Sequence, residues 1–119
     1  MAIFTKVLHS GSVYGTPITV TASASPGTII HSTGISSSVI DEVWIYANNT
    51  GLSQTVLTLE YGGTASNNRI ILPVPAQSGL TIAAAGLILT GTGTTSSTIR
   101  AYTSNPNTIN IAGYINRIS

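Results

Sequence analysis

The acids of this sequence are Asp41, Glu42 and Glu60, and any chemistry based on carboxylates must use them. Two carboxylates could act as general acid and base on a glycosidic bond if they lay roughly 5–9.5 Å apart across a cleft. Asp41 and Glu42 are adjacent, so on a strand their side chains would point to opposite faces of the sheet. We therefore expect ion pairs with arginines, with a bound metal ion as the alternative and catalysis the least favoured. The arginines available are Arg69, Arg100 and Arg117.

Two histidines, His9 and His31, are the other candidates for chemistry, and the sequence contains no cysteine. A zinc site needs three or four ligands, and neither histidine has a carboxylate at the usual ligand spacing. We expect both histidines at strand ends, on the surface or in an interface. The chain also has no G-x-S-x-G elbow, dinucleotide fingerprint or P-loop. We therefore predict that this protein is not an enzyme and has no catalytic residue, cofactor or metal ligand.

Charge is scarce in this chain. Charged residues make up 6% of the sequence, against about 25% in ordinary domains. Ile, Val and Thr fill 41 of the 119 positions, which is typical of pleated sheet and unlike a disordered chain. Four scattered cations and a net charge of +1 form no basic stripe, so we expect no nucleic-acid partner. A surface of Ser, Thr, Asn and Gly repels its copies weakly, which favours an oligomer or a lattice.

Short β-prone runs separated by turn signals extend along the whole sequence. The expected strands are residues 2–9, 18–22, 28–31, 43–47, 54–61, 69–75, 87–90, 97–102 and 108–118. The best helical fragment, residues 83–85, is bracketed too closely by glycines for more than one turn. This pattern predicts an all-β protein with a single domain over residues 1–119. We expect an antiparallel two-sheet β-sandwich of eight or nine strands, resembling a jelly roll.

The strongest strand signal lies in residues 43–61, where two β-prone runs flank an Asn/Gly turn. If the runs pair as a hairpin, their apolar faces match only when Val43 lies opposite Leu59. The same register sets Glu42 opposite Glu60, which would be unfavourable without a cation nearby. The hairpin is conditional, because a jelly roll could send the two runs to different sheets.

Four aromatic side chains fall on outward positions of the expected strands. They are Trp44, Tyr46, Tyr102 and Tyr114. Such residues could form a subunit interface, a platform for sugar, or part of the core. The low charge favours the interface, because charged residues are depleted from interface cores while Trp and Tyr are enriched there. We therefore predict these four residues as interface residues, together with Arg100 and Arg117.

Several strings of this sequence resemble the small virion proteins of tailed bacteriophages, in particular head decoration, or cement, proteins. The strings are VWIYANNTG (43–51), ILPVPAQSGL (71–80), GLIL (86–89) and INIAGYINRI (109–118). The resemblance covers about residues 40–118. It implies a jelly-roll subunit, in a homotrimer, seated on a capsid where major capsid subunits meet. There it would clamp the expanded head against internal DNA pressure without doing chemistry.

The resemblance also implies a location on the capsid surface of the virion, after synthesis in the host cytoplasm. Residues 1–15 would serve as an N-terminal arm on the shell, although their pattern also suits a strand. No apolar run approaches the roughly 18 residues of a membrane span, so we expect no membrane partner. The alternatives are a phage tail or spike domain that binds host glycan, and a free carbohydrate-binding β-sandwich module.

Overall fold

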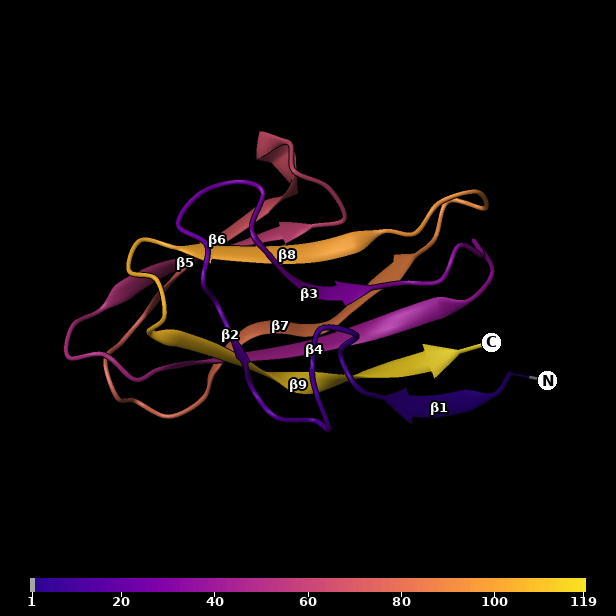
Figure 1. Cartoon of the computed structure of the whole chain (residues 1–119). Coiled ribbons are helices and arrows are strands. Elements are labelled where there is room, and N and C mark those ends of the chain that lie inside the picture. Colours follow the sequence, from indigo (N-terminus) through magenta and orange to yellow (C-terminus); the bar gives the residue numbers. More distant parts are fainter. Residues whose placement is uncertain (1) are drawn as a thin grey trace.

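The computed structural model describes residues 2–119, and strands account for its regular structure apart from one short 3₁₀ helix, η1 (Ser66–Asn68) (Figure 1). The strands are β1 (Phe4–Val7), β2 (Ile18–Thr19), β3 (Thr28–Ser32), β4 (Ile40–Asn49), β5 (Thr55–Tyr61), β6 (Arg69–Val74), β7 (Thr81–Thr90), β8 (Thr98–Thr103) and β9 (Ile109–Ile118). The expected all-β class is therefore confirmed. In the part of the chain described, no helix has the length and apolar character needed to cross a membrane.

The strands form two antiparallel sheets that pack face to face (Figure 1). Sheet A has the order β1-β9-β4-β7, with β2 also paired to β9, and sheet B has the order β3-β8-β5-β6. Strands β2, β3, β4 and β5 pair with β9, β8, β7 and β6 respectively. The chain thus folds as one long hairpin whose closed end lies between β5 and β6. This hairpin is rolled into two layers, which is the topology of a jelly roll.

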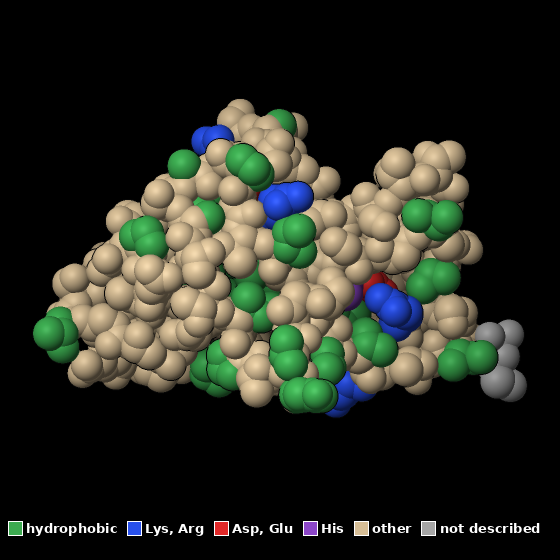
Figure 2. All heavy atoms as spheres, viewed as in Figure 1, with side chains coloured by type: hydrophobic (Ala, Val, Ile, Leu, Met, Phe, Trp, Pro, Cys, Tyr) green, Lys and Arg blue, Asp and Glu red, His purple; other side chains and the backbone are tan. Residues whose placement is uncertain are grey.

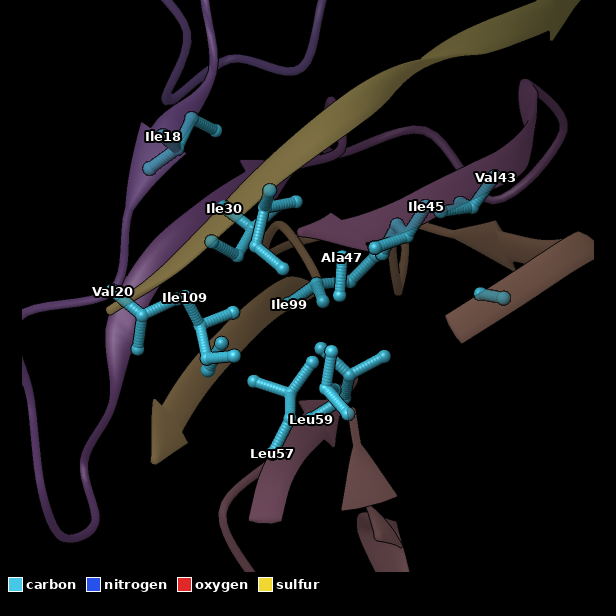
Figure 3. Close-up of a cluster of buried hydrophobic side chains, with 14 of the residues drawn as sticks. Ile18, Val20, Ile30, Val43, Ile45, Ala47, Leu57, Leu59, Ile99 and Ile109 are labelled. Carbon is cyan, nitrogen blue, oxygen red and sulfur yellow. The ribbon is translucent and has the colours of Figure 1, made fainter. Parts of the chain in front are cut away.

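The core lies between the sheets and is made of aliphatic side chains (Figure 3). Along β4 every second residue is buried, so Val43, Ile45 and Ala47 face the core, as their spacing predicts. Strand β5 contributes Leu57 and Leu59, which are also completely buried. Each fully buried aliphatic side chain of this size contributes roughly 1.5–3 kcal/mol to stability.

The predicted hairpin between β4 and β5 is wrong, although its inward faces are correct. Val43 pairs with Leu87 on one side and Ile115 on the other, both in sheet A, whereas Leu59 belongs to sheet B. Val43 and Leu59 therefore lie in opposite layers of the core. The same holds for Glu42 and Glu60, which do not face one another.

The link between β4 and β5 crosses from one sheet to the other because Asn49 holds it there. The Asn49 side chain is completely buried, and its Nδ2 donates to the carbonyl oxygens of Ser53 (2.8 Å) and Val74 (3.0 Å). Its Oδ1 accepts from the amide of Gly51 at 2.9 Å. The Asn/Gly segment thus makes a crossover between layers, whereas its composition predicts a tight turn.

The fragment with the best helical propensity, residues 83–85, lies within β7. Ala84 is 3% exposed and faces the core opposite Ile45, so burial in a sheet overrides local preference. The pairing of β7 with β4 shifts register twice, and Gly86 sits in one shift with φ +69°. With these two bulges, β7 runs as one strand through residues 83–85 and 87–90, which the sequence pattern separates into a helical fragment and a strand.

The N-terminal residues lie along the edge of sheet A. Strand β1 pairs with β9, and Ile3 and Ser119 bond each other through both backbone amides, at 2.7 and 3.0 Å. The chain then crosses to sheet B, where the Gly11 amide donates to the Ile30 carbonyl at 2.9 Å. Residues 4–7 of the predicted 1–15 arm thus form strand β1 of sheet A, and Met1 lies outside the described residues.

Candidate interaction face on sheet A

The side of sheet A that points away from the core, called here the outer face of sheet A, carries an aromatic and apolar surface. The strand register places its side chains in rows across β1, β9, β4 and β7. Its members are Phe4, Ile118 and Ile40; Lys6, Asn116, Glu42 and Ile88; Tyr114, Trp44 and Ala85; Ala112, Tyr46 and Ile82. Phe4, Ile82 and Ile88 are well exposed, at 72%, 61% and 62%.

A row of stacked side chains crosses the middle of this face. The rings of Trp44 and Tyr114 stack with centroids 5.9 Å apart and planes 12° apart. The Lys6 ammonium lies 4.7 Å from the centroid of the Tyr114 ring, in a cation–π contact. Beyond Trp44 the row ends at Gly86, where a Cβ would come within 3.3 Å of the indole. The rings therefore hold one another in place.

Glu42, in the neighbouring row, is hydrogen-bonded to Trp44 of the stacked row. Its Oε1 accepts hydrogen bonds from Trp44 Nε1 at 2.8 Å and from Asn116 Nδ2 at 3.1 Å. These two bonds, the Trp44 bond first, lower the pKa of Glu42 below its ordinary value. The Glu42 carboxylate therefore serves as a hydrogen-bond acceptor. In the strand register Asn116 lies between Glu42 and Lys6, whose charges are opposite.

The arrangement does not suit the stacking of a sugar. Because β9 lies between β1 and β4, Lys6 and Trp44 contact the Tyr114 ring from opposite sides. What the row presents outward is ring edges among aliphatic side chains. Figure 2 shows one side of the molecule, on which charged side chains are few and several hydrophobic side chains lie along the lower edge. Such a surface fits contact with another protein.

The six predicted interface residues do not lie on one face. Trp44, Tyr46 and Tyr114 share the outer face of sheet A. Tyr102 and Arg100 lie on β8, opposite Thr58 and Glu60 of β5, on the outer side of sheet B. Arg117 has the opposite orientation on β9, because it reaches Asp41 on the inner side of β4.

Arginine pairing, expected for all three acids, is found for Asp41. Both salt bridges in residues 2–119 involve this carboxylate. Glu60 is completely buried, and its oxygens accept from Ser25 Oγ at 2.6 Å and from the Gly27 amide at 2.7 Å. Arg100, its cross-strand neighbour, donates instead to the Gly27 carbonyl at 3.2 Å. Glu60 and Arg100 thus hold the 25–27 turn against sheet B through its backbone.

A buried polar cluster, which the sequence did not reveal, lies between the sheets. Arg117 Nε donates to Asp41 Oδ1 at 2.8 Å, and Arg117 Nη2 to Oδ2 at 3.0 Å. His31 Nε2 also donates to Asp41 Oδ2, at 2.8 Å, because its Nδ1 accepts from the Ser10 amide at 3.0 Å. The His9 ring lies 6.0 Å from that of His31, edge to face. In Figure 2 acidic, basic and histidine side chains adjoin at one spot, as these contacts require.

The expected surface position of the histidines is wrong, since His9 and His31 are 2% and 1% exposed. Burial, and then the neighbouring His31, lower the pKa of His9 to about 4. For Asp41, burial acts to raise the pKa, but the hydrogen bonds from Arg117 and His31 outweigh it and lower the pKa. Burial, followed by the charge of Asp41, raises the pKa of Tyr61 to about 12.

In residues 2–119, no three His, Asp or Glu side chains are grouped to hold a metal ion, and no pocket is found. Glu42 and Glu60 belong to different sheets, which contradicts the alternative of a metal ion bound between them. No protein-family model matches the sequence, and no curated protein matches it significantly. The outer face of sheet A is therefore the feature that bears most directly on function.

Proposed function

We propose that this protein is a structural, non-catalytic virion subunit. It decorates a bacteriophage capsid, bridges neighbouring major capsid subunits and works as a homotrimer. Its location is the capsid surface, and its partners are its own copies and the major capsid protein.

The observation that supports this proposal best is the outer face of sheet A. It presents ring edges and aliphatic side chains whose positions are fixed before any partner binds, and a rigid surface loses little entropy on association. Its charged members, Lys6 and Glu42, are opposite in sign and already engaged within the row. A surface of this kind resembles the core of a protein interface, which is poor in charge and rich in Trp and Tyr.

A structural role also agrees with the way in which the carboxylates are used. Asp41 binds Arg117 and His31, Glu42 binds Trp44 and Asn116, and Glu60 holds the 25–27 turn. Each carboxylate therefore orders this chain's own side chains or backbone.

Counting copies in purified virions tests the location. Quantitative mass spectrometry should find hundreds of copies per particle, in a fixed ratio to the major capsid protein. A handful of copies that fractionate with tails would overturn the capsid role and support the tail or spike alternative. Absence from the particle would overturn the virion assignment as a whole.

The use of the face can be tested with the isolated protein. Ile82→Lys and Ile88→Lys place a charge on the outer face of sheet A, while Ile71→Lys places one at a position of equal exposure, 63%, on sheet B. If trimer contacts use this face, light scattering should give trimers for the unmodified chain and Ile71→Lys, and smaller species for the other two variants. A monomeric unmodified chain at micromolar concentration would count against the homotrimer.

A glycan array separates the remaining alternative. Because Trp44 and Lys6 already contact the Tyr114 ring, we expect no sugar binding by the unmodified protein. Glycan binding that is lost in Trp44→Ala would favour the carbohydrate-binding module instead.

A further inference from the structure

The segment before β2, residues 2–17 and called here the N-terminal strap, is attached to the sandwich in an unusual way. Every side chain in it is exposed or half-buried except that of His9, which is 2% exposed. Aliphatic burial, which holds the other strands in place, therefore contributes little to this segment. The side chain that anchors the strap is one that can take up a proton.

His9 sits in a site built for the neutral ring. Its Nε2 lies 3.1 Å from the Trp44 carbonyl oxygen, so this nitrogen carries the hydrogen and donates. Its Nδ1 is buried and has no hydrogen-bond partner in the described structure. A proton added at Nδ1 would place a charge where no acceptor receives it, which is costly in the interior of a protein.

The second attachment of the strap depends on another neutral histidine. The Ser10 amide donates to Nδ1 of His31 at 3.0 Å, and this bond requires that Nδ1 be unprotonated. Two further bonds join the same stretch to β3: the Ser32 amide donates to Ser10 Oγ at 2.7 Å, and the Gly11 amide to the Ile30 carbonyl at 2.9 Å. Protonation of His31 would turn the acceptor of the first bond into a donor facing the Ser10 amide.

Among the charged and titratable groups around the pair, Asp41 contacts His31 Nε2 at 2.8 Å, but none accepts from His9 Nδ1. Asp41 of β4 already binds Arg117 of β9, so its charge is offset before either histidine is protonated. Tyr61 of β5 is neutral, with its pKa raised to about 12. His9 and His31, 6.0 Å apart, would also repel one another once both were charged.

We propose that the N-terminal strap is an acid-released latch: protonation of His9 detaches residues 8–12 from β3 and β4 while the sandwich stays folded. Release is local because the aliphatic core belongs to the other strands and contains no group that titrates in this range. Segments with few buried apolar contacts open at a lower free energy than the core does. Once residues 8–12 are detached, β1 is held by its pairing with β9.

Amide hydrogen exchange of the unmodified protein, followed by NMR and corrected for intrinsic pH effects, tests the latch. Between pH 7.5 and 4 the amides of Ser10, Gly11 and Ser32 should exchange at least tenfold faster. Those of Ile45 and Leu59, in the core strands, should keep their protection. Strap amides that stay protected down to pH 4 would overturn the proposal, as would loss of strap and core protection together, which is global unfolding.

A His9→Gln variant identifies the group responsible. Glutamine offers an amide donor to the Trp44 carbonyl and does not titrate between pH 7.5 and 4. Its strap should stay protected at least one pH unit further into acid than that of the unmodified chain. Equal midpoints for the two chains would exclude His9 as the trigger. If the variant does not hold its strap at pH 7.5, the ring titration of His9 decides: in the unmodified chain it must coincide with the loss of strap protection.

Discussion

The indole of Trp44 and the phenol ring of Tyr114 stack across β4 and β9, with planes 12° apart. The Trp44 carbonyl, on the same residue, accepts from His9 on the inner side of the sheet. One residue thus joins the outer face of sheet A to the buried polar cluster.

The pKa of Glu42 should depend on Trp44. In Trp44→Phe an aromatic ring remains for stacking but the Nε1 donor is lost, so the pKa of Glu42 should rise towards its ordinary value. Asn116→Ala should give a smaller rise in the same direction, because its bond contributes less. Carboxyl NMR titration measures both, and Tyr46→Phe, which has no contact with Glu42, is the control. An unchanged pKa of Glu42 in Trp44→Phe would contradict the hydrogen bond from Trp44 to Glu42.

Stability should fall in mild acid because of His9. Its pKa is about 4 in the folded chain against 6.5 when unperturbed, so between these values the unfolded chain binds a proton that the folded chain does not. The free energy of unfolding should therefore fall below pH 6.5, by at most about 1.4 kcal/mol per pH unit, and level off for this residue near pH 4. Asp41, with its lowered pKa, adds a separate loss at still lower pH. Urea titrations at several pH values, with His9→Gln as control, measure the first window; a flat profile there would refute it.

Two adjacent acids should differ sharply in their importance for folding. Asp41 is 1% exposed and accepts from both Arg117 and His31, so Asp41→Asn leaves donors in the interior without their carboxylate. The expected cost is about 3 kcal/mol in the free energy of unfolding. Glu42→Gln, one position away on the outer face, should cost far less. Equal losses in chemical denaturation would mean that the cluster contributes no more than surface bonds do.

Gly113 should tolerate no side chain. Its φ is +142°, and an added Cβ would collide with the Trp44 carbonyl oxygen and lie 3.0 Å from His9 Nε2. Gly113→Ala should therefore disrupt the pairing of β9 with β4, lower the melting temperature by well over 5 °C and release His9. At Gly34 an added Cβ has no atom within 4 Å, so Gly34→Ala should melt within a degree or two of the unmodified chain. Similar melting temperatures for the two variants would contradict this picture.

Alternation of apolar residues was sufficient to predict the two-sheet sandwich. In β4 and β9 most inward positions hold aliphatic residues, so the inward faces of both strands could be predicted correctly. The pairing of strands could not, because it depends on contacts far apart in sequence. Asn48–Ser53 has the composition of a hairpin turn, but Asn49 bonds Val74, a residue that no local pattern connects to it. The helical propensity of residues 83–85 is similarly overridden by burial.

The polar cluster was missed for the same reason, although one local signal did exist. Asp41 has the parity of Val43 and Ile45, so the pattern that placed those residues in the core also placed this acid there. Arg117 has the parity of Ile115 on β9 and could have been recognised as its partner. For His9 no periodic pattern applies, because the strap crosses between sheets. His31 lies in β3 at a register shift where the consecutive residues Ile30 and His31 are both buried, which breaks the alternation.

The paired ends of the chain have a consequence for its connectivity. Ile3 and Ser119 bond each other through both amides, so a short linker between them would close the protein into a ring without moving any strand. Such a ring could be opened again in the exposed 92–96 tip between β7 and β8, which lies at the same end of the sandwich as the original termini. The order in which the strands are synthesised is therefore separable from the order in which they pair.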